Sequence, residues 1–277
     1  MRKWLEDLAT RLPAAAKYPG VMPLVGVSAS IAKTLHTRRL HRIHYDRRGW
    51  WVNRQRQVTL FSPDLHTPTL HRLEAMVKDF WCHGGSLSPG NIVIDIGAGV
   101  GDEVVIFSRW VGPAGRVVAI EAHPVTARCL KLAVTSNRLE NTTVIEEAAA
   151  DRETTLLMSD VLQHEQNAVV GAGGTLSVKA RTVDDMLAPL ELPSIDLIKM
   201  NIEGAEVMAL SGMRRTLART RTLVVACHDF LASRSPDDPR RTSAKVIAIL
   251  TAAGFETYSR SDAPLPFVRD YVYAHAV

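Results

Sequence analysis

The residues best suited to chemistry lie in one glycine-rich segment and in an acidic residue that follows it. An apolar run leads into Asp95 and then into three glycines at alternate positions, Gly97, Gly99 and Gly101. Alternate glycines let a ligand lie against the backbone and permit dihedral angles that other residues avoid. Glu121 ends the next apolar run, where a carboxylate is well placed to bind the hydroxyls of a ribose. The pattern predicts a nucleoside-binding site.

The spacing of this segment distinguishes between nucleoside cofactors. Nicotinamide sites follow G-x-G-x-x-G, whereas residues 97–101 follow G-x-G-x-G and Asp95 stands where a diphosphate would approach. A carboxylate opposes a diphosphate but suits the ammonium and sulfonium groups of S-adenosylmethionine. We therefore expect S-adenosylmethionine, with Asp95 near its ammonium, directly or through water, and Glu121 on its ribose. A tight turn without a ligand is the alternative, and the presence of both acids disfavours it.

The elements that must position these residues alternate between strands and helices from residue 91 onward. Strands are expected at 91–96, 116–121, 143–147, 195–202 and 221–227. Helices are expected at 102–111, 124–136, 204–218 and 242–253. This alternation predicts an α/β fold with a mostly parallel, doubly wound sheet. Residues 256–261 and 267–276 read as an antiparallel C-terminal pair, which is compatible with a methyltransferase-type Rossmann fold.

The beginning of the chain follows a different pattern. Residues 1–45 have a helical pattern that is broken at Pro19-Gly20, and Trp4, Leu5, Leu8 and Leu12 recur at helical spacing. Residues 50–61 indicate a strand or hairpin, and a helix is expected from about Pro68 to Trp81. We expect an N-terminal helical and hairpin appendage.

The change of pattern suggests two parts of the chain. Residues 1–80 form a basic arm, and residues 81–277 form the S-adenosylmethionine-binding catalytic domain. Within that domain, residues 152–194 interrupt the alternation with a polar loop, a glycine-rich run, a strand and a short helix. An insertion at this point is a suitable place for substrate recognition.

Ligands of doubly wound sheets bind outside the carboxyl ends of the strands, so residues at those ends are candidates for the site. The third strand is followed by residues that could border an adenine, namely Ala148, Ala149 and Asp151. The fourth and fifth strands end in chemically capable side chains, namely Lys199, Asn201, Glu203, Glu206, His228 and Asp229. The expected cofactor-binding residues are Asp95, Gly97, Ala98, Gly99, Gly101, Glu121, Ala122, Ala149 and Asp151.

Four segments together resemble the FkbM-type S-adenosylmethionine-dependent methyltransferases. They are VIDIGAGVGDE (93–103), VVAIEAHP (117–124), RTVDDML (181–187) and IDLIKMNIEGAE (195–206). The resemblance covers about residues 90–230. It implies a cofactor held by Asp95, Gly97, Gly99 and Glu121, with Lys199, Asn201, Glu203 and Glu206 between cofactor and substrate. The family consists mostly of O-methyltransferases that act on sugars, polyketides and other natural-product or surface-glycan hydroxyls.

The chain departs from the family pattern at Asn201. Many relatives have aspartate there, and they have a Glu-x-His pattern where this chain has Ala226, Cys227 and His228. An amide is neither a general base nor a strong ligand for a hard divalent cation. A metal-dependent, catechol-type mechanism is therefore disfavoured, and we expect no metal site.

The candidate catalytic residues are His228, Glu203, Asn201 and Lys199. A hydroxyl acceptor must lose its proton, and histidine has the unperturbed pKa nearest neutrality, so His228 suits general base catalysis. Glu203 could orient His228 or take the proton itself, and Asn201 could hold the acceptor by a hydrogen bond. Lys199 lies in an apolar strand, where a specific buried partner is the simpler role.

Composition separates the arm from the rest of the chain. Residues 1–56 carry 12 Lys and Arg against 3 Asp and Glu, within a chain of 33 basic and 29 acidic residues. Such asymmetry suits an anionic partner, an oligomer contact or a solvated helix face. Three cysteines without paired spacing favour a reducing compartment. No apolar run has the length of a transmembrane segment, and we expect a cytoplasmic protein.

Two other functions compete with methylation of a small-molecule or glycan hydroxyl. An RNA methyltransferase would use the basic arm, where aromatic side chains among arginines could stack on bases. No N-P-P-[YF] segment or separate RNA-binding domain supports a nucleic-acid acceptor, so we do not expect one. A non-catalytic S-adenosylmethionine-binding protein is the third class, and Asn201 motivates it. The arm could also mediate homo-oligomerisation. The aromatic and basic residues that motivate the RNA methyltransferase alternative are Arg38, Arg39, Arg42, Tyr45, Arg47, Arg48, Trp50, Trp51, Arg54 and Arg56.

Overall fold

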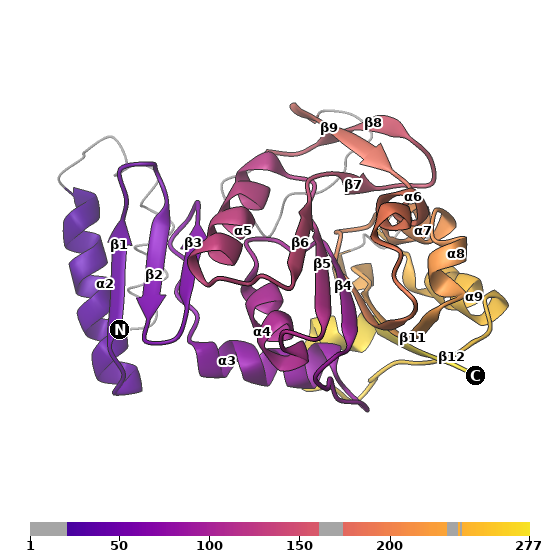
Figure 1. Cartoon of the computed structure of the whole chain (residues 1–277), viewed down its shortest axis with the longest axis horizontal. Coiled ribbons are helices and arrows are strands. Elements are labelled where there is room, and N and C mark those ends of the chain that lie inside the picture. The colour runs from indigo at the N-terminus through magenta and orange to yellow at the C-terminus, as the bar shows by residue number, and fades with distance from the viewer. Residues whose placement is uncertain (1–20, 161–173, 232–237, 239) are drawn as a thin grey trace.

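A seven-stranded sheet lies at the centre of the computed structural model (Figure 1). The structure describes residues 21–160, 174–231, 238 and 240–277. The central strands are β4 (Ile92–Ile96), β5 (Arg116–Ile120), β6 (Thr142–Ile145), β10 (Ile195–Met200), β11 (Thr220–Ala226), β12 (Phe255–Tyr258) and β13 (Tyr271–Ala276). Their order is β12-β13-β11-β10-β4-β5-β6.

The direction of the strands confirms the expected fold. The five strands β6, β5, β4, β10 and β11 are parallel to one another, and β13 is antiparallel to both β11 and β12. The chain leaves β4 toward β5 on one side and later returns to β10 on the other. The carboxyl ends of β4 and β10 therefore flank the switch point, where doubly wound sheets bind their ligands. This is the methyltransferase-type Rossmann arrangement.

Helices cover both faces of this sheet because its strands are apolar on both sides. Along β4, Val93 joins one buried layer and Ile94 joins the other. The first layer holds α3 (Leu70–Met76), its π-helical continuation η1 (Val77–Trp81), α4 (Asp102–Val111) and α5 (Pro124–Ser136). The second holds α6 (Val183–Leu187), α7 (Glu206–Ser211), α8 (Arg214–Leu217) and α9 (Ser243–Ala252).

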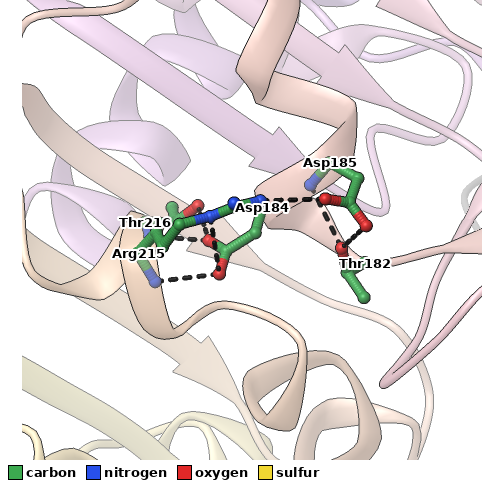
Figure 2. A network of polar contacts seen from close by, with 5 residues as sticks. All are labelled: Thr182, Asp184, Asp185, Arg215 and Thr216. Atoms are coloured by element: carbon green, nitrogen blue, oxygen red, sulfur yellow. Dashed lines mark hydrogen bonds and ion pairs between the residues drawn. The ribbon is translucent and has the colours of Figure 1, made fainter.

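The helix expected at 204–218 is divided into α7 and α8. The interruption follows Ser211, where Gly212 packs so tightly that an added Cβ would lie 2.1 Å from the carbonyl oxygen of Ala150. Asp184 of α6 then holds the start of α8, since its carboxylate accepts hydrogen bonds from the backbone N–H groups of Arg215 and Thr216 at 2.8 and 2.7 Å (Figure 2). The RTVDDML segment, which contains α6, is thus hydrogen-bonded to the start of α8.

Figure 2 also shows how the same segment starts its own helix. Thr182 precedes α6, and its hydroxyl accepts a hydrogen bond from the backbone N–H of Asp185 at 3.1 Å. Arg215 reaches back and donates to the Asp185 carboxylate at 2.8 Å. Capping interactions of this kind explain why the segment carries two aspartates without placing them in the site.

The arm contains a strand that the helical pattern did not predict. Helix α2 (Val21–Thr37) lies against a small antiparallel sheet of β1 (His41–Tyr45), β2 (Trp51–Gln55) and β3 (Thr59–Ser62). Residues 41–45 are therefore extended, contrary to the expectation of helix through residue 45. Ser30 of α2 fixes this packing, because its hydroxyl accepts from the N–H of Ile43 and donates to its carbonyl. The expected apolar stripe of residues 4–12 lies outside the described residues.

Two strands of the insertion and the short strand before it form a second small sheet, which lies above the central strands in the view of Figure 1. Its strands are β7 (Ala148–Ala149), β8 (Thr154–Met158) and β9 (Leu176–Arg181). Strand β8 is missing from the sequence prediction, which assigned a loop there. Residues 161–173, which include most of the glycine-rich run, lie outside the described residues. No helix in the described part of the chain is long and apolar enough to cross a membrane.

The remaining helical elements of the described residues are three short 3-10 turns. They are η3 (Ala188–Leu190), η4 (Asp229–Leu231) and η5 (Pro266–Asp270). Turn η4 begins at Asp229, one of the rim candidates. The Asp229 carboxylate accepts hydrogen bonds from the N–H groups of Thr242 and Ser243 and from the Ser243 hydroxyl. Asp229 therefore holds the start of α9 and has a structural role.

Candidate active site

A cavity of about 900 Å³ opens at the carboxyl ends of the central strands. One side is formed by the segments that follow β4, β5 and β6, and another by those that follow β10 and β11. Residues of α2, α3, η1 and η5 complete the wall. A cavity of this size is typical of a site for a cofactor with a second small molecule.

The three glycines of the loop after β4 have different tasks. All three have positive φ angles, +77° at Gly97, +56° at Gly99 and +95° at Gly101. An added Cβ on Gly97 would lie 2.0 Å from the carbonyl oxygen of Asn201, and one on Gly101 would lie 2.8 Å from Leu130. No atom of the described protein lies within 4 Å of the corresponding position at Gly99. Gly99 therefore leaves room for a ligand, whereas Gly101 serves packing and does not line the cavity.

Glu121 is fixed beside this loop. Its carboxylate accepts hydrogen bonds from the N–H of Gly99 at 2.8 Å and from the N–H of His123 at 2.9 Å. Burial raises the pKa of Glu121, and the two backbone N–H groups oppose that shift. Each carboxylate oxygen can accept a further hydrogen bond, and Glu121 lines the cavity with Ala122 and Thr126. This geometry suits a ribose diol.

Asp95 differs from the expectation that it would face the cofactor ammonium. Its side chain is fully buried, and its Oδ1 forms an ion pair with Nζ of Lys199 at 2.7 Å. The same ammonium donates to the carbonyl oxygen of Gly97 at 2.6 Å and lies 5.3 Å from the ring centre of Trp81. Lys199 lines the cavity and Asp95 does not. Lys199 therefore ties the centre of the sheet to the glycine loop.

Glu103 is a site residue that the sequence reasoning missed, although it ends the quoted glycine motif. It lies in the first turn of α4, lines the cavity and has no ion-pair partner among the described residues. Burial raises the pKa of Glu103, and Lys199 opposes this while Asp95 adds to it. Its position one residue after Asp102, at a helix start, was the available signal.

The charges around Lys199 favour a cationic ligand. Burial alone would lower the pKa of Lys199, but Asp95, Glu103 and Glu121 outweigh burial and raise it, so the group stays an ammonium. One ammonium thus faces three carboxylates in a region shielded from water. A ligand with positive groups would restore the balance of charge there. S-adenosylmethionine carries an ammonium and a sulfonium, so these residues fit it.

The segment after β6 contributes an apolar patch for a flat ring. Ala148 and Ala149 are buried and line the cavity with Met158 of β8. Ala98 also lines it, from the glycine loop. Asp151, in contrast, is exposed, contacts Arg152 at 2.9 Å and does not line the cavity. Its expected contact with the cofactor is therefore not supported by the geometry.

His228 lies between two carboxylates at the end of β11. Its Nε2 is 3.1 Å from Glu203 Oε1, and its Nδ1 is 3.2 Å from Glu206 Oε1. The His228 side chain is 8% exposed, and the Glu206 side chain is fully buried. Burial by itself lowers the pKa of His228, but hydrogen bonds and charges of the two glutamates raise it to about 9. The ring is an imidazolium at neutral pH, rather than the neutral base expected from its ordinary pKa.

The backbone after β10 turns Glu203 toward the cavity. Glu203 has a φ of +51°, and Gly204 has a φ of +101°. A left-handed conformation is costly for a residue with a side chain, and such strain is characteristic of functional sites. The N–H of Gly204 donates to Glu206 Oε1 at 2.9 Å, which holds the turn. The Glu203 side chain remains 22% exposed and lines the cavity, unlike that of Glu206.

Asn201 brings an unsatisfied acceptor to the same place. Its Oδ1 is buried and has no hydrogen-bond partner among the described residues, and the residue lines the cavity. Its backbone is fixed by a hydrogen bond from its N–H to the carbonyl oxygen of Ile96 at 2.9 Å. A buried acceptor without a donor is unfavourable. Asn201 is therefore suited to receive a proton donor from a ligand.

The arrangement has the features of a site in which a nucleoside cofactor meets an acceptor. Residues 95–257 match the Methyltransferase FkbM domain, which is more than half of the chain. The chain belongs to the FkbM methyltransferase family. It is an S-adenosylmethionine-dependent methyltransferase, as the charge of the cavity also favours.

Individual relatives are distant. The 2-O-methyltransferase NoeI of Sinorhizobium fredii is 24% identical over 209 residues, which are 67% of this chain and 81% of NoeI. The solved FkbM methyltransferase of Methylobacillus flagellatus is 19% identical with a TM-score of 0.48, and the match covers 69% of this chain but only 44% of that longer chain. Aeropyrum pernix fibrillarin, solved with bound S-adenosyl-L-methionine, is 14% identical with a TM-score of 0.45 over 83% of this chain and 94% of its own.

Two tryptophans among the arginines of the arm are unsuited to stacking on bases. Trp50 and Trp51 are 8% and 3% exposed. Trp51 packs under α2, and Trp50 packs against Val100 and Cys129 of the catalytic domain. The arginines around them are exposed, but both indole rings are part of the core, and Tyr45 is half-buried against the same cluster as Trp51. This arrangement does not favour the RNA methyltransferase alternative.

Proposed function

We propose that the protein methylates a hydroxyl group of a small molecule, natural product or glycan. The observation that supports this most is the Glu203, His228 and Glu206 array at the edge of the cavity. An oxygen nucleophile must lose a proton, and this array provides a carboxylate that faces the cavity. S-adenosylmethionine supplies an electrophilic methyl group when it is bound.

Within this array, we assign the role of base to Glu203 and a positioning role to His228. Both nitrogens of His228 already face carboxylates, so the imidazolium has no lone pair to offer an acceptor. Glu203 is the member with an exposed side chain, and its carboxylate can accept the hydroxyl proton. His228 holds that carboxylate in place and stabilises its charge, while Glu206 holds His228. Asn201 Oδ1 fixes the acceptor or the cofactor through a hydrogen bond.

The proposed cofactor contacts follow from the same geometry. Glu121 binds the ribose hydroxyls, the backbone at Gly97, Ala98 and Gly99 lies against the cofactor, and Ala122 with Ala149 borders the adenine. Glu103 replaces Asp95 as the carboxylate nearest the ammonium, because Lys199 separates Asp95 from the cavity. Lys199 positions the loop.

We further propose that the chain is divided at about residue 80 but that both parts build the site. Lys33 and Arg72 of the arm line the same cavity as the residues of the catalytic domain. The arm therefore contributes to acceptor recognition. All three cysteines are free thiols, which supports a reducing compartment such as the cytoplasm.

The test is methyl transfer from isotopically labelled S-adenosylmethionine to a panel of hydroxyl acceptors, with products analysed by mass spectrometry. We expect a methyl ether. Products methylated only on nitrogen or carbon would contradict the proposal. Binding of S-adenosylmethionine without transfer to any hydroxyl acceptor of the panel would also contradict it.

A further inference from the structure

Two cations of the arm face the cavity without a counter-ion. Lys33 lies on α2 and Arg72 lies in the first turn of α3, and both line the cavity. Neither forms an ion pair with a described residue. The other basic groups that line the cavity are paired with carboxylates, namely Lys199 with Asp95, His66 with Asp102, and His228 with Glu203 and Glu206.

The environment of Lys33 is unfavourable as it stands. Lys33 is partly buried, whereas Arg72 is exposed, and the two residues are close enough for Arg72 to affect Lys33. Burial lowers the pKa of Lys33, and the positive charge of Arg72 lowers it further. Two like charges that converge on a cavity are unfavourable unless a negative group lies between them. A bound anion would supply the missing negative charge, so Lys33 and Arg72 are suited to bind one.

The wall beside these cations is apolar and aromatic. Leu73, Met76 and Phe80 follow Arg72 along the same face of the α3–η1 helix and line the cavity. Phe80 contacts Phe267 and Tyr271 at ring-centre distances of 5.8 and 6.4 Å. Flat rings of ligands pack well against such surfaces. The acceptor side of the cavity thus combines an apolar surface with a cationic end.

We propose that Lys33 and Arg72 form an anion-binding subsite for the methyl acceptor, so that the acceptor is an acidic ring compound. Its carboxylate, sulfate or phosphate would contact the two cations, and its ring would pack against Phe80, Phe267 and Tyr271. This inference rests on the proposed function for the assignment of this side of the cavity to the acceptor. The other source of an anion is the carboxylate of the cofactor itself.

The experiment measures binding, so it does not depend on turnover. Calorimetry is performed on the full chain saturated with S-adenosylhomocysteine, using 4-nitrophenyl β-D-glucuronide and 4-nitrophenyl β-D-glucoside, which differ in one carboxylate. We expect the glucuronide to bind about 10-fold tighter or more, as hydrogen bonds between charged groups imply. The preference should be lost in Lys33→Met and in Arg72→Met. It should persist in Arg42→Met, which removes an exposed arginine of β1.

The remaining outcomes overturn the inference. Equal or undetectable binding of the two sugars to the unsubstituted protein contradicts it, as does a preference that survives both substitutions. A comparison of S-adenosylhomocysteine with 5′-methylthioadenosine tests whether the cations bind the cofactor instead, because only the former has a carboxylate. If Lys33→Met and Arg72→Met weaken the binding of S-adenosylhomocysteine but not that of 5′-methylthioadenosine, the two cations bind the carboxylate of the cofactor. The assignment of the subsite to the acceptor is then wrong. Failure of the O-methylation assay, in contrast, leaves these affinities unchanged and bears only on the proposed function.

Discussion

Nζ of Lys199 lies 2.7 Å from Oδ1 of Asp95, in a buried ion pair at the centre of the sheet. The two residues are register partners on neighbouring strands β10 and β4. The ammonium also donates to the carbonyl oxygen of Gly97, so it joins both strands to the glycine loop. The glycine loop after β4 and the segment at the end of β10 are therefore joined directly, although they are far apart in the sequence.

Removal of this ammonium should destabilise the fold. Lys199→Met leaves the Asp95 carboxylate buried without its partner, and breaking a buried pair costs roughly 3–5 kcal/mol. The free energy of unfolding, measured by urea denaturation, should fall by about that amount. The double variant Asp95→Asn with Lys199→Met is the control and should recover part of the loss. A single variant as stable as the unsubstituted protein would show that the pair does not hold the sheet.

The loop glycines should separate folding from binding. Gly97→Ala forces a Cβ against the backbone of Asn201, so we expect a lower melting temperature and little soluble protein. Gly99→Ala meets no protein atom within 4 Å and should cost about 1 kcal/mol for its left-handed backbone. It should nevertheless weaken S-adenosylhomocysteine binding about 10-fold or more by calorimetry. Unchanged affinity in a folded Gly99→Ala variant would place the cofactor elsewhere.

Glu103 should recognise the charged end of the cofactor. Glu103→Gln removes the carboxylate assigned to the ammonium, and we expect S-adenosylmethionine to bind about 10-fold weaker or worse. Binding of 5′-methylthioadenosine, which lacks the ammonium, should change by less than about 2-fold. Glu140→Gln, an exposed substitution, serves as the control. Equal losses for both nucleosides would refute the assignment.

Protonation of His228 should make stability depend on pH. The pKa of His228 is raised from an ordinary value of 6.5 to about 9, so protonation stabilises the folded state. This contribution is complete below about pH 6.5 and is lost as the pH rises through 9, with a size up to about 3 kcal/mol. Urea denaturation of the unsubstituted protein and of His228→Gln between pH 6 and 10 measures it. If the free energy of unfolding changes with pH in the same way for both proteins, His228 is not an imidazolium in the folded state.

The positions of the central strands along the chain and the glycine loop could be predicted because the relevant signals are local. Apolar runs alternate with helical runs, and Gly97, Gly99 and Glu121 fall where a known geometry needs them. Strand β1 could not be predicted in this way, since its extended form depends on pairing with β2 and on Ser30 of α2. Local periodicity does not report such contacts.

The site was predicted less completely than the fold, because pairing between distant residues decides it. Asp95 and His228 were correctly placed at strand ends, but their partners changed their chemistry. Lys199 forms an ion pair with the carboxylate expected to bind the cofactor, and two glutamates stabilise the protonated form of the imidazole expected to act as the base. Glu103 is part of the glycine motif but was not predicted as a site residue. The prediction relied on the glycines and did not consider the first turn of the helix that follows them.

The central claim is that Glu203 takes the proton and His228 positions it, and single-turnover kinetics test this most directly. With the acceptor from the panel and S-adenosylmethionine both saturating, Glu203→Gln should slow methyl transfer by about 10²–10⁴-fold. Its affinity for S-adenosylhomocysteine should stay within about 2-fold, and His228→Gln should lose less of the rate than Glu203→Gln. A Glu203→Gln enzyme that transfers methyl groups at close to the normal rate would contradict the account, as would a larger loss in His228→Gln.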